Sequence, residues 1–349
     1  MEKDWKPTPL GGTDTAAILG MSPWRRPIDI WLAKTGKLEH GDGPLPERLT
    51  LGQIYEEPLA ALWEQRHEGT QLWSPGDDPM IRAYDGRLAC YQENTDTDAE
   101  TPHHKYRLVS LDYDWIGGTP DRIVLDLEYR LSDRGLEIKT ASPFAIGDYG
   151  PDGSDDIPPH YLIQCQHYML LTGLRTWELF VAFGNQETRN YIIEEDVDLH
   201  SIILERTKQF WEQNILADCQ PEIDHSESWK KYLGQKYKRV KSDYRAASPA
   251  EGGLVLDYQV AVRAVKKAEE AKRLAENKLR ETIKGAKGIT LPDGRRFGWI
   301  ERKGSVSLKR VIETMADRFD IGTGAVDEIK EECRSESIRV FSPPRNGKE

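Results

Sequence analysis

The sequence lacks the long apolar segments of membrane proteins and the cysteine patterns of secreted ones. No apolar run approaches the roughly 18 residues that a membrane span needs. Its 4 cysteines are Cys90, Cys165, Cys219 and Cys333. They form no CxxC pair and have no histidine at zinc-finger spacing, which indicates neither a disulfide framework nor a structural zinc site. Residues 1–5 lack the apolar core of a signal peptide, so we expect a cytoplasmic protein.

Charged residues are abundant in the sequence. Charged residues make up 31% and hydrophobic residues 38% of the 349 residues, and the mean hydropathy is −0.66. This composition is typical of a strongly hydrated globular protein and not of a disordered chain. At this length, one large domain, or one domain with an appendage, can bury a sizeable core.

The charge is distributed unevenly along the chain. The net charge of −11 taken alone argues against a nucleic-acid partner. However, residues 1–229 carry 20 basic against 41 acidic residues, whereas residues 230–310 carry 22 against 9. This asymmetry favours an acidic, metal-binding body joined to a basic, phosphate-binding arm, with a solvated helical face as the alternative. The arm's basic residues on either side of its central helix include Lys230, Lys231, Lys236, Lys238, Arg239, Arg295, Arg296, Arg302 and Lys303.

Apolar spacing predicts an alternation of helices and strands up to residue 215. Helices are expected at 15–19, 27–33, 50–67, 160–172 and 200–214, and strands within 106–124, 130–142, 177–183 and 191–193. Thr13 or Asp14 is the expected N-cap of the first helix. Pro58 is expected to start, kink or interrupt the third.

The remainder of the chain has a different pattern. A long helix is predicted over 254–283, with apolar residues in approximately heptad spacing, followed by a hairpin that turns at residues 292–294 and a short helix over 308–317. We therefore expect a nuclease-sized domain at 1–225, a linker at 226–252, and a basic long helix, β-hairpin and tail at 253–349.

Asp121, Glu137 and Lys139 have the chemistry of a hydrolytic site. Glu137 and Lys139 are two apart on a predicted strand, so they share one face while Ile138 points to the core. Because paired strands lie about 4.8 Å apart, an aspartate on the neighbouring strand can join Glu137 in holding a hard cation such as magnesium. Phosphodiester hydrolysis needs such a cation to neutralise developing charge and to lower the pKa of the attacking water.

The pattern Asp-x(15)-Glu-x-Lys is weak by itself, because a solvated strand residue is the alternative at each position. Two further segments strengthen it. Glu56 and Glu57 follow Gly52 on the predicted helix 50–67. Gln164 and Tyr168 are four residues apart and therefore lie on one face of the predicted helix 160–172.

In their order along the chain, these segments resemble those of the YqaJ-like viral recombinases and lambda-type exonucleases of the PD-(D/E)xK nuclease superfamily. Residues 11–20 are similar to the family's opening turn and helix, and residues 52–57 to its G-x-x-x-E helix. Residues 119–121 and 136–139 are similar to its catalytic pair, and residues 161–173 to its glutamine-bearing helix.

The resemblance implies an α/β, restriction-endonuclease-like core, that is, a mixed β-sheet flanked by helices, with a C-terminal helical and hairpin appendage. The metal ligands that it implies are Glu56, Asp121, Glu137 and the carbonyl of Ile138. The catalytic residues that it implies are Asp121, Glu137, Lys139 and Gln164. Mg²⁺ is the expected cofactor, with Mn²⁺ able to substitute.

The function implied is metal-dependent DNA exonuclease activity, as 5′-to-3′ resection of double-stranded ends for phage-type single-strand annealing recombination. The implied partners are double-stranded DNA ends, an annealing protein and further copies in a ring-shaped homo-oligomer, with no membrane. A phage or prophage origin in a bacterial cytoplasm is also implied. A structure-specific or restriction-type endonuclease that uses the same site, and a non-catalytic DNA-binding module, remain alternatives.

Two departures from the family pattern leave assignments open. Glu56 and Glu57 are adjacent, and the four-residue offset from Gly52 favours Glu56 as the ligand. The family often has an arginine before its opening Gly-Gly turn, where this chain has residues 6–10 without one. The expected DNA contacts are Arg25, Arg26 and Tyr168, with ordinary surface arginines as the alternative for the first two.

Histidines and tryptophans are given structural interpretations. His160 and His167 are seven apart on a predicted helix, but a zinc site would need two more convergent ligands. The tryptophans, Trp24 among them, occur mostly in apolar patterns and are expected in the core and not as base-stacking platforms.

Overall fold

A computed structural model describes residues 7–37, 47–75, 89–93, 106–237 and 245–298, together with Ile312 and Gly324. Apart from Ile312, the expected helix at 308–317 lies outside the described residues, as do Lys238, Arg239, Arg302 and Lys303. The chain divides into two compact units, Met1–Lys236 and Tyr237–Glu349. No helix in the described ranges has the length and hydropathy needed to cross a bilayer.

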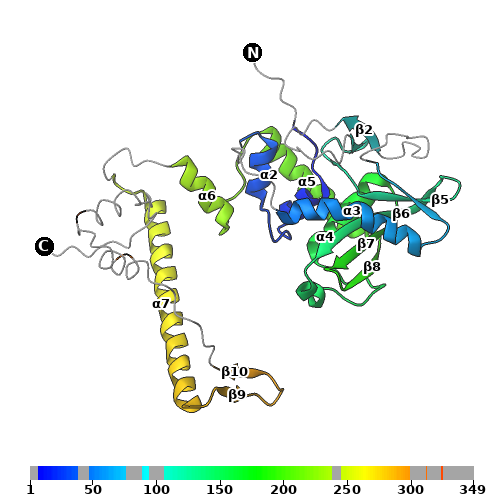
Figure 1. Cartoon of the computed structure of the whole chain (residues 1–349). Coiled ribbons are helices and arrows are strands. Elements are labelled where there is room, and N and C mark those ends of the chain that lie inside the picture. The colour runs from blue at the N-terminus through cyan, green and yellow to red at the C-terminus, as the bar shows by residue number, and fades with distance from the viewer. Residues whose placement is uncertain are drawn as a thin grey trace. The chain divides into compact units, whose positions relative to one another are not determined.

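A mixed five-stranded sheet forms the centre of the first unit (Figure 1). In spatial order its strands are β1 (Thr70–Trp73), β5 (Arg122–Asp126), β6 (Leu131–Ala141), β7 (Thr176–Phe183) and β8 (Glu187–Glu194). β6 and β7 are parallel, and the other neighbours are antiparallel. A smaller sheet contains β2 (Ala89–Glu93), β3 (Tyr106–Ser110) and β4 (Gly117–Gly118).

Helices flank this sheet and confirm the predicted restriction-endonuclease-like core. They are α1 (Gly12–Ile18), α2 (Pro27–Lys34), α3 (Glu47–Arg66), α4 (Pro159–Thr172), α5 (Val197–Phe210) and α6 (Glu227–Lys236). A 3₁₀ helix, η1 (Pro143–Asp148), follows β6, and a π-helical turn, η2 (Trp211–Leu216), continues α5.

Side-chain alternation in the central strands explains how both faces of the sheet are covered. Trp177 and Leu179 of β7 share a buried cluster with residues of α4, whereas Phe180 packs with Trp63 of α3. A strand buried on both faces has a near-continuous apolar sequence, as Trp177–Phe183 does. In β6, Ile138 joins the α3 cluster, which confirms that it faces the core.

Three helices of the first unit differ in detail from the sequence-based predictions. The N-cap of α1 is Gly11, because the Asp14 carboxylate accepts the Gly11 amide hydrogen bond at 3.1 Å from inside the helix. α3 continues through Pro58, whose exposed position limits the loss to one hydrogen bond on the solvent side. α5 begins at Val197, because Asp196 caps it by accepting the Leu199 amide hydrogen bond at 2.9 Å.

Helix α6 lies within the stretch that was predicted as a linker. Trp229 of α6 is 1% exposed and packs edge-on against Tyr232, which in turn packs against Trp31 of α2. Because this stretch is rich in Lys and Ser, its sequence did not predict the packing of Trp229. Residues 227–236 therefore belong with the first unit, while the three-part division at 1–225, 226–252 and 253–349 stays a prediction.

The second unit contains a long helix and a hairpin. α7 (Pro249–Ile283) begins five residues before the predicted start, because Ser248 caps it and Pro249 occupies its first turn. β9 (Gly288–Thr290) and β10 (Arg296–Gly298) pair antiparallel. Gly294 has a φ of 85° in the turn between them, which confirms the predicted hairpin.

His167 is a buried histidine that holds α4 against neighbouring segments. The ring contacts the Thr15 hydroxyl at Nδ1 and the Gly117 carbonyl at Nε2, each at 2.9 Å. Since the carbonyl only accepts, Nε2 carries the hydrogen and Nδ1 accepts from Thr15. Burial lowers the pKa of His167 from 6.5 to about 4, despite the Gly117 hydrogen bond.

Because the unfolded chain binds a proton at His167 below pH 6.5 and the folded chain does not until about pH 4, stability falls as the pH drops through this window. The shift corresponds to roughly 3 kcal/mol. We predict that urea unfolding of wild type and His167→Gln will show a stability difference that shrinks from pH 6.5 to pH 4. A difference that stays constant with pH would contradict the assignment.

Candidate active site

Asp121 and Glu137 meet through strand register. Arg122 of β5 pairs with Leu136 of β6 in an antiparallel ladder, so Asp121, one residue before β5, lies opposite Glu137. The Asp121 Oδ2 atom accepts a hydrogen bond from the Ile138 amide at 2.8 Å. Because the N–H and C=O of one strand residue point to the same side, the Ile138 carbonyl also faces Asp121.

Glu137 is the most deeply buried acid of this group, with 1% of its surface exposed. Its Oε1 atom accepts hydrogen bonds from Lys139 and, at 2.5 Å, from Gln164 Nε2. Its Oε2 atom is buried and has no hydrogen-bond partner. Burial and the nearby Asp121 carboxylate raise the pKa of Glu137 to about 8. A buried, unsatisfied carboxylate oxygen beside a second carboxylate fits a cation ligand.

Lys139 supplies the positive charge closest to this pair. Burial opposes its charge, but the carboxylates of Glu137 and Asp121 outweigh burial and raise the pKa of Lys139 well above its usual value. The ammonium group therefore stays protonated at neutral pH. Glu137 and Lys139 contact each other from positions two apart on β6, so the two side chains share a face, as alternation predicts.

Arg122 connects α3 to the catalytic strands. Its side chain is 4% exposed and binds Glu56 Oε1 at 2.7 Å, the Asp121 carbonyl at 2.6 Å and the Glu57 carboxylate. Burial and Asp121 raise the pKa of Glu56 to about 7, although Arg122 opposes the rise. The Glu56 side chain is 19% exposed and the Glu57 side chain 73%, so Glu56 is the acid that faces inward.

The described residues contain no group of three His, Cys, Asp or Glu side chains already arranged to hold a metal ion. Two of the acids are engaged by cations: Glu56 by Arg122 and Glu137 by Lys139. The donor set nevertheless fits a hard cation, because carboxylates dominate it and Glu137 Oε2 has no other partner. Glu56 would have to turn from Arg122 to join Asp121 and Glu137.

A cavity of about 620 Å³ opens onto these groups. Glu56, Asp121, Ile138, Lys139 and Gln164 line it. Its other lining residues are Thr13, Ala16, Ser22, Trp24, Arg25, Arg48, Leu49, Gly52, Gln53, Thr140, His160 and Tyr161. The cavity is therefore walled by α1 and the loop after it, by α3, β6 and α4, and by Asp121 before β5, so that five segments distant in the sequence meet there.

Gln164 and Tyr168 support the site from α4. Besides its bond to Glu137, Gln164 Nε2 lies 3.4 Å from the Tyr168 hydroxyl, which donates to the Thr119 carbonyl at 3.3 Å. Tyr168 is 5% exposed, so little of it is available for the DNA contact expected of it, and it holds the segment between β4 and β5, just before Asp121. A Cβ at Gly12 would lie 2.8 Å from Gln164, so glycine there allows α1 to approach.

The two expected DNA-binding arginines differ in their surroundings. Arg25 lines the cavity and pairs with Asp14 at 2.8 Å, while Lys34 lies 3.2 Å from the same carboxylate. Burial opposes the charge of Asp14, but these two cations hold its pKa well below the usual value. Arg26 is half-buried at the N-cap of α2 and does not line the cavity.

Several cavity residues escaped the sequence analysis. Trp24, expected in the core, is 55% exposed at the cavity, with its ring edge-on to His160 at 4.7 Å. The Arg48 guanidinium lies 5.6 Å from the Trp24 ring centre. In the sequence, Ser22-Pro23 places Trp24 after the end of a helix, and this position was the feature that could have predicted its exposure. Arg122 carried no signal, because nothing in the sequence relates it to α3.

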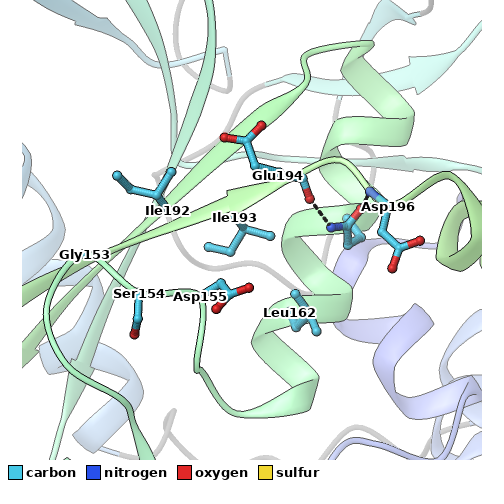
Figure 2. A pocket seen from close by; sticks show the side chains of 9 residues that line it. Gly153, Ser154, Asp155, Leu162, Ile192, Ile193, Glu194 and Asp196 are labelled. Atoms are coloured by element: carbon cyan, nitrogen blue, oxygen red, sulfur yellow. Dashed lines mark hydrogen bonds between the residues drawn. The ribbon is translucent and has the colours of Figure 1, made fainter.

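A second cavity, of about 460 Å³, lies between α4, β8 and the loop before α4 (Figure 2). Asp155, Glu194 and Asp196 make its lining acidic. Gln166 bridges this wall, since its amide donates to the Glu194 carbonyl at 2.7 Å and accepts from the Asp196 amide at 3.0 Å. None of the predicted site residues lines this cavity.

Comparisons with known proteins find similarity to one protein family. Residues 3–175 match the model of the YqaJ-like viral recombinase domain. The chain is 22% identical to the uncharacterized protein YqaJ of Bacillus subtilis (strain 168) over 280 residues, covering 79% of this chain and 76% of that protein.

Solved structures also match at low similarity. The alkaline exonuclease LHK-Exo of Laribacter hongkongensis is 16% identical, with a TM-score of 0.40 over 66% of this chain and 93% of that one. A phage-related exonuclease from Haemophilus somnus 129PT is 14% identical, with a TM-score of 0.37 over 61% of this chain and 98% of that one.

Arg122 makes a testable contribution to the site. We predict that Arg122→Ala will lower the free energy of unfolding in metal-free buffer by about 3 kcal/mol, because it leaves Glu56 partly buried without its cation. Arg130→Ala is the matched control, since Arg130 is 69% exposed and pairs with exposed acids; its loss should cost less than about 1 kcal/mol. Equal effects in urea titrations would contradict a structural role for Arg122.

Proposed function

Because residues 3–175 match the model of the YqaJ-like viral recombinase domain, we propose that this protein is a magnesium-dependent deoxyribonuclease that degrades double-stranded DNA from its ends. The observation that carries the proposal is the pairing of half-buried Asp121 with buried Glu137, with Lys139 and Gln164 bonded to Glu137 and one Glu137 carboxylate oxygen left without a partner. The cavity beside the pair gives a phosphodiester access to these groups.

Glu56, Asp121, Glu137 and the Ile138 carbonyl would hold the magnesium ion, and Mn²⁺ would substitute for it. When bound, such an ion neutralises charge on the phosphate and lowers the pKa of the attacking water. Gln164 fixes the Glu137 carboxylate by donating to Oε1, which leaves Oε2 for the cation. Tyr168 steadies both Gln164 and the segment between β4 and β5 that precedes Asp121.

Lys139 has a separate role in this proposal. Its ammonium group is protonated and lines the cavity beside Glu137. A fixed positive charge there stabilises negative charge that develops on the phosphate and on the attacking oxygen. Arg25 lines the same cavity and is the better placed of the two expected arginines to meet a phosphate.

The finer activity that we propose is 5′-to-3′ resection for single-strand annealing recombination. The description of the family as viral recombinases supports it. An annealing protein, a ring-shaped homo-oligomer and a phage or prophage origin belong to the same proposal. An endonuclease that uses the same residues is its competitor.

We predict that the purified protein will release nucleotides from end-labelled linear duplex DNA with Mg²⁺ and not with EDTA, and will leave closed circular DNA intact. Asp121→Ala and Glu137→Ala should each reduce the rate by at least about a thousandfold, because a hard cation loses a ligand. Glu187→Ala, an exposed acid on β8, is the control. Cleavage of closed circles would favour the endonuclease, and full activity of either site variant would reject the site.

The basic arm is proposed to hold the DNA backbone. Lys287 and Arg296 are exposed beside and within the β9–β10 hairpin. If both contact phosphates, Lys287→Ala/Arg296→Ala should flatten the plot of log K against log salt by about 2, since each contact contributes about 0.9. Fluorescence anisotropy at several salt concentrations measures the slope, and Arg130→Ala serves as the control. An unchanged slope would remove these two residues from the interface.

A further inference from the structure

Helix α7 exposes an unusual amount of apolar surface. Ile283 is the one buried residue among the 35 of α7. Leu254 is 69% exposed, Val262 41% and Val265 59%. Helical stability in water comes mainly from packing of an apolar face. Contacts within the described chain do not supply that packing for α7.

The exposed side chains follow a coiled-coil pattern. Positions three and four apart form one stripe along the helix, and a stripe of this spacing faces a partner helix in a coiled coil. The stripe consists of Leu254, Tyr258, Ala261, Val265, Ala268, Lys272, Ala275 and Leu279. It extends over nearly four heptads, and Lys272 is its single charged member.

We propose that α7 binds α7 of a second copy of this chain in an antiparallel coiled coil. Antiparallel pairing about the midpoint between residues 266 and 267 brings the two ends of the stripe together, so that Leu254 of one copy lies opposite Leu279 of the other. Val265 then lies opposite Ala268. Large side chains fill the space beside small ones, which is how helices interdigitate at close packing.

Charge selects this orientation over the parallel one. Antiparallel pairing places Asp257 opposite Lys278 along one flank of the stripe, and Lys272 opposite the small Ala261. Parallel pairing in register would place Lys272 against Lys272 and would bring no opposite charges together on the flanks. A buried pair of like charges is costly, so the second copy fits in one direction.

The contact leaves the basic face of the helix available. Lys266, Lys267 and Arg273 lie away from the stripe at helical spacing. A two-fold pair of helices would therefore present two basic faces, one from each copy. This inference stands independently of the nuclease activity, because it concerns contacts between copies and not the chemistry of the site.

Engineered cysteines test the register directly in the full chain. In a Cys219→Ser background, which removes the exposed free thiol found among the described residues, Leu254→Cys/Leu279→Cys should give a covalent dimer on oxidation, seen on a non-reducing gel. Residues 254 and 279 are 25 apart, or roughly 37 Å along one helix, too far for a bond within a chain. Each single variant should give no more dimer than the background protein.

The other outcomes overturn the proposal. Strong cross-linking by either single variant would mean parallel pairing. A double variant that stays uncross-linked would mean that another segment or another partner covers the stripe.

A pair of matched substitutions tests the stripe without cross-linking. Val265 in the stripe and Val260 outside it are 59% and 57% exposed, so an aspartate at either position faces similar solvent in the single chain. Val265→Asp should halve the mass measured by light scattering, and Val260→Asp should leave it unchanged. Circular dichroism reports whether each variant keeps its helix. Equal masses for the two variants would reject the stripe as the contact.

Discussion

The buried carboxylate of Glu137 beside Asp121 is the constraint to which the rest of the site responds. Two acids in the interior repel each other and lose hydration, and both effects raise the pKa of Glu137. Three groups donate hydrogen bonds to these acids. Lys139 and the Gln164 amide donate to Glu137, and the Ile138 N–H donates to Asp121. These three groups compensate the charge without occupying Glu137 Oε2. The arrangement tolerates the repulsion and keeps a ligand atom available.

A second compensation ties the site to the helix on the other side of the sheet. Arg122 neutralises Glu56 and Glu57 from within β5, next to Asp121. The Glu56 carboxylate of α3 is thus held near the site by a guanidinium. In the proposed function, a divalent cation would compete with Arg122 for Glu56. The affinity for metal would then depend on this arginine as well as on the acids.

The site could be predicted from sequence where it depends on local geometry. Alternation along one strand places Glu137 and Lys139 on one face and Ile138 in the core, and α-helical spacing places Gln164 beside Tyr168. Contacts between distant segments were not predictable, because no local period encodes them. Arg122 reaches across to α3, Trp24 reaches the cavity, and Trp229 with Tyr232 packs the polar helix α6 against α2. Tyr168 was expected to contact DNA, because its burial results from tertiary packing that the sequence does not reveal.

The distribution of charge follows from the same constraint. An acidic site repels a phosphate backbone at long range, and two arginines of the first unit are engaged by acids inside it: Arg122 by Glu56, and Arg134 by the buried Glu178. Such internal pairs stabilise the acidic core but are poorly available to a ligand. If the protein binds DNA as proposed, attraction would come largely from elsewhere in the chain, and residues 230–310 have 22 basic against 9 acidic residues. Metal-binding acids and phosphate-binding bases in separate parts of the chain would each keep their charge without neutralising the other.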